Sequence, residues 1–211
     1  LTEYLPVSST AHMIFTSSFF GIQEDDFVKL FQVSIQFGAI LAVVVLYWKK
    51  FFDFSKINFY IKLACAVIPA LVLGKIFDDK IDAILGNPIP IAIVLILGGI
   101  VLLFIDGRFH NPTVANEEDI TIKKAVTIGF WQCLAMMPGT SRSAASIIGG
   151  MQQGLTRETA AEFSFFLAVP TMLAVTTYSL FLKTYEVSQL KGYELLTQSS
   201  DNLKLFFIGN I

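Results

Sequence analysis

The chain has 211 residues, of which 54% are hydrophobic and only 15% are charged. Ordinary soluble domains carry about 25% charged residues, so this composition argues against a soluble globular enzyme and against a disordered chain. With 15 basic and 17 acidic residues, the chain lacks the basic surface of a nucleic-acid-binding protein. Cys65 and Cys133 both lie in apolar runs, which excludes a disulfide framework. We therefore expect an integral membrane protein with no nucleic-acid partner.

Four segments are long and apolar enough to cross a bilayer, which takes about 20 residues. In chain order they are residues 27–48, 57–77, 89–105 and 159–182. A last apolar stretch, 203–211, is too short and is expected to be a partial fifth span. Because the chain also starts at Leu1 rather than at Met, we expect it to be truncated at both ends.

Two further apolar stretches, 1–21 and 120–154, are each interrupted by a short polar segment that contains a proline, Pro6 or Pro138. Irregular backbone is tolerated at membrane depth only when it is buried in protein or lines a wet cavity. Both stretches are therefore predicted to be re-entrant hairpins, in which one helix enters, a polar tip follows, and a second helix returns.

An internal comparison indicates a repeat. A shift of 132 residues, counted on the sequence, aligns Pro6 with Pro138 and Ser9 with Ser141, and it aligns segment 41–43 with 173–175, both Leu-Ala-Val. A hairpin followed by three spans crosses the membrane an odd number of times, so a second copy must be inverted. We predict an all-α integral membrane protein, a single domain 1–211 formed by an inverted repeat of this unit. The first repeat is 1–105 and the second is 120–211.

Basic residues suggest the orientation. Lys49, Lys50 and Lys56 form the densest basic cluster and follow the first span. The positive-inside rule places that side in the cytoplasm.

The two hairpin tips hold polar groups in apolar surroundings. Glu3, His12 and Arg142 are ionisable, and an ionisable group within a membrane is a functional candidate by default. The accompanying hydroxyls could instead satisfy backbone groups freed at the proline breaks. These hydroxyls are Ser8, Ser9, Thr10, Thr140, Ser141, Ser143 and Ser146.

The second tip has the chemistry of an anion site. Gly139 permits a tight turn, and Ser141, Arg142 and Ser143 would open a helix whose N-terminal N–H groups and guanidinium bind phosphate. Glu3 cannot bind phosphate directly, so it is expected to be a metal ligand or a general base, and a divalent cation would offset its charge. At bilayer depth, this chemistry suggests a ligand with a phosphate head and a lipid tail.

The motifs of residues 3–12, Glu-Tyr-Leu-Pro-Val-Ser-Ser-Thr-Ala-His, and 138–143, Pro-Gly-Thr-Ser-Arg-Ser, together with the run 35–47, resemble the bacterial undecaprenyl-diphosphate phosphatase (bacitracin-resistance) family. The resemblance covers essentially the whole chain. It implies hydrolysis of undecaprenyl diphosphate to undecaprenyl phosphate and inorganic phosphate, which recycles the lipid carrier for peptidoglycan synthesis. It also implies a Mg²⁺ or Ca²⁺ cofactor and two re-entrant hairpins among six spans.

The resemblance assigns roles to individual residues. Glu3 matches the second of the family's two motif glutamates and is expected to bind the metal. The first glutamate would lie upstream of Leu1. Ser9 matches the proposed nucleophile, and His12 the motif histidine, which lies three residues from Ser9 and could assist it. Ser141 and Arg142 match the phosphate-binding pair. The full set expected to be catalytic is Glu3, Ser9, His12 and Arg142, and the set expected to bind substrate is Ser8, Thr10, Gly139, Thr140, Ser141, Ser143 and Ser146.

Several alternatives remain open at this stage. The attacking group is either Ser9 or an activated water. Inverted repeats with broken helices are also typical of secondary transporters, so a lipid-phosphate flippase is the second hypothesis. We expect a multi-pass protein of the bacterial inner membrane, in contact with membrane lipids, whose site opens to the periplasm. The sequence does not predict an oligomeric state.

Overall fold

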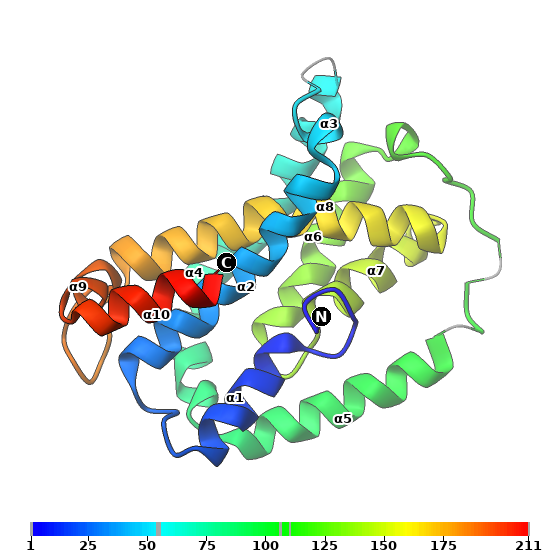
Figure 1. The fold of residues 1–211 in the computed structure, drawn as a ribbon. Helices are drawn as coiled ribbons and strands as arrows, with labels where there is room; N and C mark the ends of the chain where they lie inside the picture. The colour runs from blue at the N-terminus through cyan, green and yellow to red at the C-terminus, as the bar shows by residue number, and fades with distance from the viewer. Residues whose placement is uncertain (1, 54–55, 106, 110, 211) are drawn as a thin grey trace.

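A computed structural model describes residues 2–53, 56–105, 107–109 and 111–210, which form a bundle of helices (Figure 1). Within these residues the β-structure is limited to two isolated bridges, so the all-α prediction is confirmed. Four helical segments are long and apolar enough to cross a membrane: Asp26–Leu46, Ile57–Asp78, Pro88–Ile105 and Arg157–Leu182. The principal helices are α1 (Ser9–Phe19), α2 (Asp26–Leu46), α4 (Ile57–Leu85), α5 (Pro88–Ile105), α6 (Ile122–Gln132), α7 (Arg142–Gln152), α8 (Arg157–Thr177) and α10 (Ser200–Asn210).

One helix extends beyond its predicted end, and another ends where the sequence predicts. The second span is predicted to end at residue 77, but α4, which has 29 residues in all, continues to Leu85 and includes Asp78 and Lys80. A 29-residue helix is about 44 Å long and exceeds the roughly 30 Å hydrocarbon core, so its charged last turns extend beyond the apolar layer. At the end of α8, a π-helical turn, Tyr178–Leu182, continues the helix to residue 182, the predicted end of the fourth span. Such π turns are frequent at functional sites.

The two hairpin regions are built differently. In the second, α6 and a short 3₁₀ turn, Cys133–Met136, enter, and α7 returns. In the first, the described residues 2–7 form turns and a bend, and α1 follows as the returning helix.

The two halves nevertheless match in detail. Helices α1 and α7 each have 11 residues, and α2 and α8 each have 21. A serine caps each returning helix: Ser8 Oγ accepts from the Ala11 N–H at 3.4 Å, and Ser141 Oγ accepts from the Ala144 N–H at 3.3 Å. These equalities are what the repeat hypothesis expects, whereas the inverted relation between the halves stays a prediction.

The core is centred on α8, which packs against α2, α4 and α7. Phe163, Phe166 and Leu167 of α8 are at most 1% exposed. Helix α6 approaches α4 so closely at Gly129 that an added Cβ would overlap the carbonyl oxygen of Ala66. By contrast, α5 lies along the edge of the bundle beside α1 (Figure 1) and buries only Ile91. An apolar helix with so little buried surface is suited to face lipid.

An ionic cluster joins the two halves at the end of the bundle near α3 (Trp48–Phe51) and the 3₁₀ turn η2 (Glu117–Asp119). Lys50 forms ion pairs with Glu117 and with Glu162 of α8, the latter at 2.7 Å. Lys62 of α4 donates to the carbonyl oxygens of Glu117 and Glu118 at 3.3 and 2.7 Å. We call these five residues the ionic cluster.

Candidate active site

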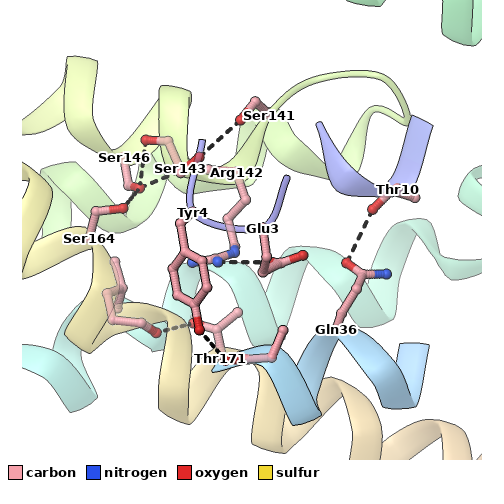
Figure 2. Close-up of polar contacts among 12 residues, drawn as sticks. Glu3, Tyr4, Thr10, Gln36, Ser141, Arg142, Ser143, Ser146, Ser164 and Thr171 are labelled. Atoms are coloured by element: carbon pink, nitrogen blue, oxygen red, sulfur yellow. Dashed lines mark hydrogen bonds and ion pairs between the residues drawn. The ribbon is translucent and has the colours of Figure 1, made fainter. Parts of the chain in front are cut away.

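The two polar tips meet in the folded chain. Arg142, at the start of α7, donates from Nη2 to Oε1 of Glu3 at 3.2 Å, although 139 positions separate the two residues (Figure 2). Ser143 donates to the carbonyl oxygen of Leu5 at 3.2 Å, so a second bond joins the same segments. The sequence predicted a carboxylate at one tip and a guanidinium at the other, and the structure brings them into direct contact.

A cavity of about 450 Å³ lies between these tips and helices α2, α4 and α8. Most of its remaining wall is apolar and includes Val33, Leu71, Met136 and Met172. A polar end and an apolar wall suit a ligand with a charged head and a hydrocarbon tail. Of the residues predicted to be catalytic or to bind substrate, those that line this cavity are Glu3, Ser8, Ser9, Thr10, Gly139, Thr140, Ser141, Arg142 and Ser143.

The second tip presents the N-terminus of α7 to the cavity. Gly139 has a φ of +99°, and a Cβ there would lie 2.5 Å from the carbonyl oxygen of Ile91, so both the backbone angle and the space require glycine. After this turn, Ser141 caps α7 and its Oγ lies 3.1 Å from that of Ser143. A helix N-terminus flanked by an arginine is an anion site.

The first tip is held in a sparsely populated backbone conformation. Ser8 has a φ of +58° and is 4% exposed, and a non-glycine residue in this region stores strain. The next turn carries Thr10, whose Oγ1 donates to Oε1 of Gln36 on α2 at 3.3 Å (Figure 2). Ser9, between them, also lines the cavity. Three consecutive hydroxyl-bearing residues of the first tip therefore line the cavity.

Three buried polar atoms of the cavity residues have no hydrogen-bond partner within the described part of the chain: Glu3 Oε2, Arg142 Nη1 and Gln132 Oε1. Buried polar atoms are nearly always paired, so unpaired ones at a cavity indicate groups that await a ligand. Arg142 Nη1 is a donor and suits a phosphate oxygen. The two oxygens are acceptors and require a donor or a cation.

The residues present can hold a divalent cation only in part. No group of three His, Cys, Asp or Glu residues occurs within the described ranges. Glu3 supplies one carboxylate oxygen, and Mg²⁺ is commonly bound by one or two carboxylates with the remaining positions taken by water and substrate phosphates. Glu3 fits such a site if the substrate completes it.

Two predicted site residues do not reach the cavity. His12 is exposed, with Nδ1 2.9 Å from the carbonyl oxygen of Ser8, and it is not among the lining residues. Ser146 is 0% exposed, and its Oγ lies 2.6 Å from that of Ser164 on α8. Ser146 therefore fastens α7 to α8 rather than contacting a ligand in this structure.

The structure also adds residues that the sequence did not assign. Gln132 donates from Nε2 to Oγ1 of Thr171 at 3.1 Å, and both residues line the cavity. Lys75 and Lys183 line its far end. The lysines could have been found only by knowing that the ends of α4 and α8 adjoin.

These features define a class: a multi-pass helical membrane protein in which two broken segments hold a carboxylate, a guanidinium and a serine-capped helix N-terminus at one apolar cavity. The chain belongs to the Bacitracin resistance protein BacA family, whose model matches residues 1–209.

Curated relatives agree with this assignment. The chain is 53% identical to the undecaprenyl-diphosphatase of Flavobacterium johnsoniae and 54% identical to that of Flavobacterium psychrophilum, in both cases over all of this chain and 76% of the relative. It is 45% identical to the undecaprenyl-diphosphatase of Porphyromonas gingivalis, over all of this chain and 78% of that protein. The resemblance expected from the motifs is confirmed.

Proposed function

We infer that this protein is an undecaprenyl-diphosphate phosphatase, which hydrolyses undecaprenyl diphosphate to undecaprenyl phosphate and inorganic phosphate. The reaction recycles the lipid carrier of peptidoglycan synthesis, and it is the activity through which the family confers bacitracin resistance. The observation that carries the inference is the contact between Glu3 and Arg142 at the polar end of an apolar cavity. Membership in the BacA family and the names of the relatives support it.

The geometry suggests how the head group is held. Arg142 Nη1, which has no partner among the described residues, and the N–H groups at the start of α7 would bind the terminal phosphate. Because these donors face the position where negative charge grows during attack, they stabilise the transition state. The apolar wall would accommodate the first units of the prenyl chain.

The bond that breaks joins the bridging oxygen to the terminal phosphorus. Either Ser9 Oγ or a water molecule attacks that phosphorus, and undecaprenyl phosphate leaves with the bridging oxygen. If Ser9 attacks, a phosphoserine forms and water then releases inorganic phosphate. Glu3 would accept the proton of the attacking group or hold a cation. When bound, a divalent cation supplies positive charge to the diphosphate.

We propose that the site opens to the periplasm. Lys75 and Asp78, in the C-terminal half of α4, and Tyr178 and Lys183, just beyond α8, line the cavity. The ionic cluster lies at the opposite end of these helices. If the side of Lys49, Lys50 and Lys56 is cytoplasmic, the cavity extends toward the outer face of the inner membrane.

The decisive experiment measures phosphate release from undecaprenyl diphosphate by purified protein in detergent with Mg²⁺. Wild-type protein should release phosphate, and Arg142→Ala should lose at least about 100-fold in kcat/KM, because a charged donor to the transition state is gone. Full activity of Arg142→Ala in a folded sample would contradict the phosphate-binding role.

A lipid-phosphate transporter is the second candidate, favoured by one observation. The two halves meet at the cavity, while the ionic cluster joins them at the other end, as in proteins that expose a central site to one side at a time. Reconstituted vesicles distinguish the two functions. Translocation of the head group without phosphate release would support transport, and phosphate release would support the phosphatase.

A further inference from the structure

Hydrogen-bond accounting fixes the orientation of the Gln132 side chain. Thr171 Oγ1 donates its only proton to the carbonyl oxygen of Leu167 at 2.8 Å. Its oxygen can therefore only accept from Gln132, and the Gln132 atom that faces it at 3.1 Å must be Nε2. The amide oxygen, Oε1, is then the atom left without a partner, and it is buried.

Gln132 Oε1 and Glu3 Oε2 present the same chemical requirement at the same cavity. Both residues line it, and Gln132 is 3% and Glu3 8% exposed. The Glu3 neighbour, Tyr4, packs edge-to-face on Phe165 of α8, with ring centroids 6.0 Å apart. It also contacts the cluster that contains Met172, the residue next to Thr171. Thr171, the partner of Gln132, and the residues that Tyr4 contacts thus lie on the same stretch of α8, which places Gln132 and the Glu3 segment against one part of that helix.

The occupant must be positive or a hydrogen-bond donor. Leaving two acceptors buried and unpaired costs about 1–3 kcal/mol each. Phosphate oxygens cannot satisfy them, because they are acceptors too. Carboxylate and amide carbonyl oxygens are ligands that Mg²⁺, Ca²⁺ and Mn²⁺ accept, and a cation would also take oxygens of the diphosphate.

We propose that Oε1 of Gln132 joins Oε2 of Glu3 as a protein ligand of a divalent cation that would also take oxygens of the diphosphate head group. The proposal rests on the function inferred above and adds a second ligand to it. Gln132 then has two roles: Nε2 donates the hydrogen bond that joins α6 to Thr171 of α8, and Oε1 binds the cation. Thr171 acts through Gln132 and is a positioning residue.

The test measures Mn²⁺ binding by electron paramagnetic resonance on the purified full chain, with Mn²⁺ alone and with Mn²⁺ plus methylenediphosphonate, which is not hydrolysed. Gln132→Leu should weaken Mn²⁺ binding by about 10-fold or more, the loss expected when ligation is impaired. Gln132→Glu, which keeps an oxygen and adds charge, should bind Mn²⁺ at least as tightly as wild type. Thr171→Val, which removes the inter-helix bond but keeps Oε1, should weaken Mn²⁺ binding by less than Gln132→Leu, because it disturbs the position of the ligand without removing it.

The outcomes separate the possible roles. If Gln132 serves only the inter-helix bond, Gln132→Leu and Thr171→Val will lower the Tm equally and leave Mn²⁺ binding unchanged, which overturns the proposal. Unchanged Mn²⁺ binding with a reduced kcat would overturn it in favour of water orientation. If Gln132→Leu does not fold, weaker Mn²⁺ binding by Gln132→Glu than by wild type overturns it instead. Mn²⁺ binding that depends on Gln132 without phosphate release by wild-type protein would leave the cation site standing and contradict the phosphatase.

Discussion

Glu3 and Arg142 are each other's counter-ion, yet neither is saturated by the contact. Their side chains are 7% and 13% exposed, and each keeps one buried atom without a partner among the described residues. A buried ion pair is seldom more stabilising than a well-packed apolar pair. The retention of two charges here is therefore better explained by a ligand that completes them than by stability.

At this scale, replacing Arg142 by lysine separates charge from geometry. Arg142→Lys keeps the positive charge but loses the planar fork, of which one nitrogen donates to Glu3 and the other is proposed to bind a phosphate oxygen. We expect kcat/KM for undecaprenyl diphosphate to fall by about 10–100-fold, less than for Arg142→Ala. Steady-state kinetics on folded protein measure this, and equal rates for Arg142→Lys and wild type would show that charge alone suffices.

Two predicted site residues, Ser146 and His12, do not line the cavity, because the direction of a side chain depends on packing that the sequence does not show. Ser146 and Ser143 both lie in the first turns of α7, and both are hydroxyl-bearing neighbours of Arg142. Only packing decides that one faces Ser164 of α8 and the other contacts Leu5. His12 shares a helix with Ser9, but that helix turns its imidazole outward. The motifs indicated two segments that line one cavity, whereas the face that each side chain takes depends on the partner helix.

At the scale of elements, the second tip depends on a single turn. Gly139 combines a positive φ with close contact to Ile91 and Val94 in the first half of α5. Helix α7 begins directly after this turn, and its N-cap Ser141 and first residue Arg142 line the cavity. Its conformation therefore connects the packing of α5 to the anion site.

Substituting Gly139 by alanine should disturb both stability and catalysis. A Cβ at this position is strained by the positive φ and meets the Ile91 carbonyl oxygen at 2.5 Å, which should cost about 2 kcal/mol or more. We expect a lower Tm in detergent and a loss of phosphate release. Gly98→Ala in α5, where a Cβ meets nothing within 4 Å, is the matched control. An unchanged Tm for Gly139→Ala would contradict the structure of the tip.

Element boundaries were predictable where composition changes sharply. Helices α2 and α5 begin within a residue of the predicted starts, at Asp26 and Pro88, because polar or proline residues precede their apolar runs. The extension of α4 beyond residue 77 was not predictable in this way. Its last turns lie beside the end of α8, where Tyr178 donates to Asp78 at 2.6 Å. That stabilisation comes from a contact between residues 100 positions apart.

At the scale of the whole molecule, the ionic cluster links the halves far from the cavity. Lys50 lies between Glu117 and Glu162 and over the Phe166 ring, 4.8 Å from its centroid. Burial raises the pKa of Glu117, the nearby Glu162 raises it further, and Lys50 opposes both effects. Lys50 therefore offsets the repulsion between the two carboxylates that it joins.

Removing this lysine should make stability depend on pH in a defined direction. In Lys50→Met, the pKa of Glu117 in the folded state rises further above its unfolded value. The variant should be about 1–3 kcal/mol less stable than wild type near neutral pH, and this deficit should shrink as the pH falls through the raised pKa. Tm measured across pH checks this. Lys49→Met, at an exposed site, should show no such trend, and a deficit that grows with acidity would contradict the arrangement.

The orientation of the whole molecule can be tested by thiol labelling in intact cells. Lys75 lines the far end of the cavity, Thr10 lines its polar end, and Lys49 is exposed at the opposite end of the bundle. With Cys65 and Cys133 replaced by alanine, a membrane-impermeant reagent added outside should label Lys75→Cys first and Thr10→Cys more slowly, because Thr10 is reached through the cavity. Lys49→Cys should react only after the membrane is permeabilised. Labelling of Lys49→Cys from outside, with Lys75→Cys protected, would reverse the proposed orientation, and labelling of Thr10→Cys from the Lys49 side would show that the cavity opens through the ionic cluster instead.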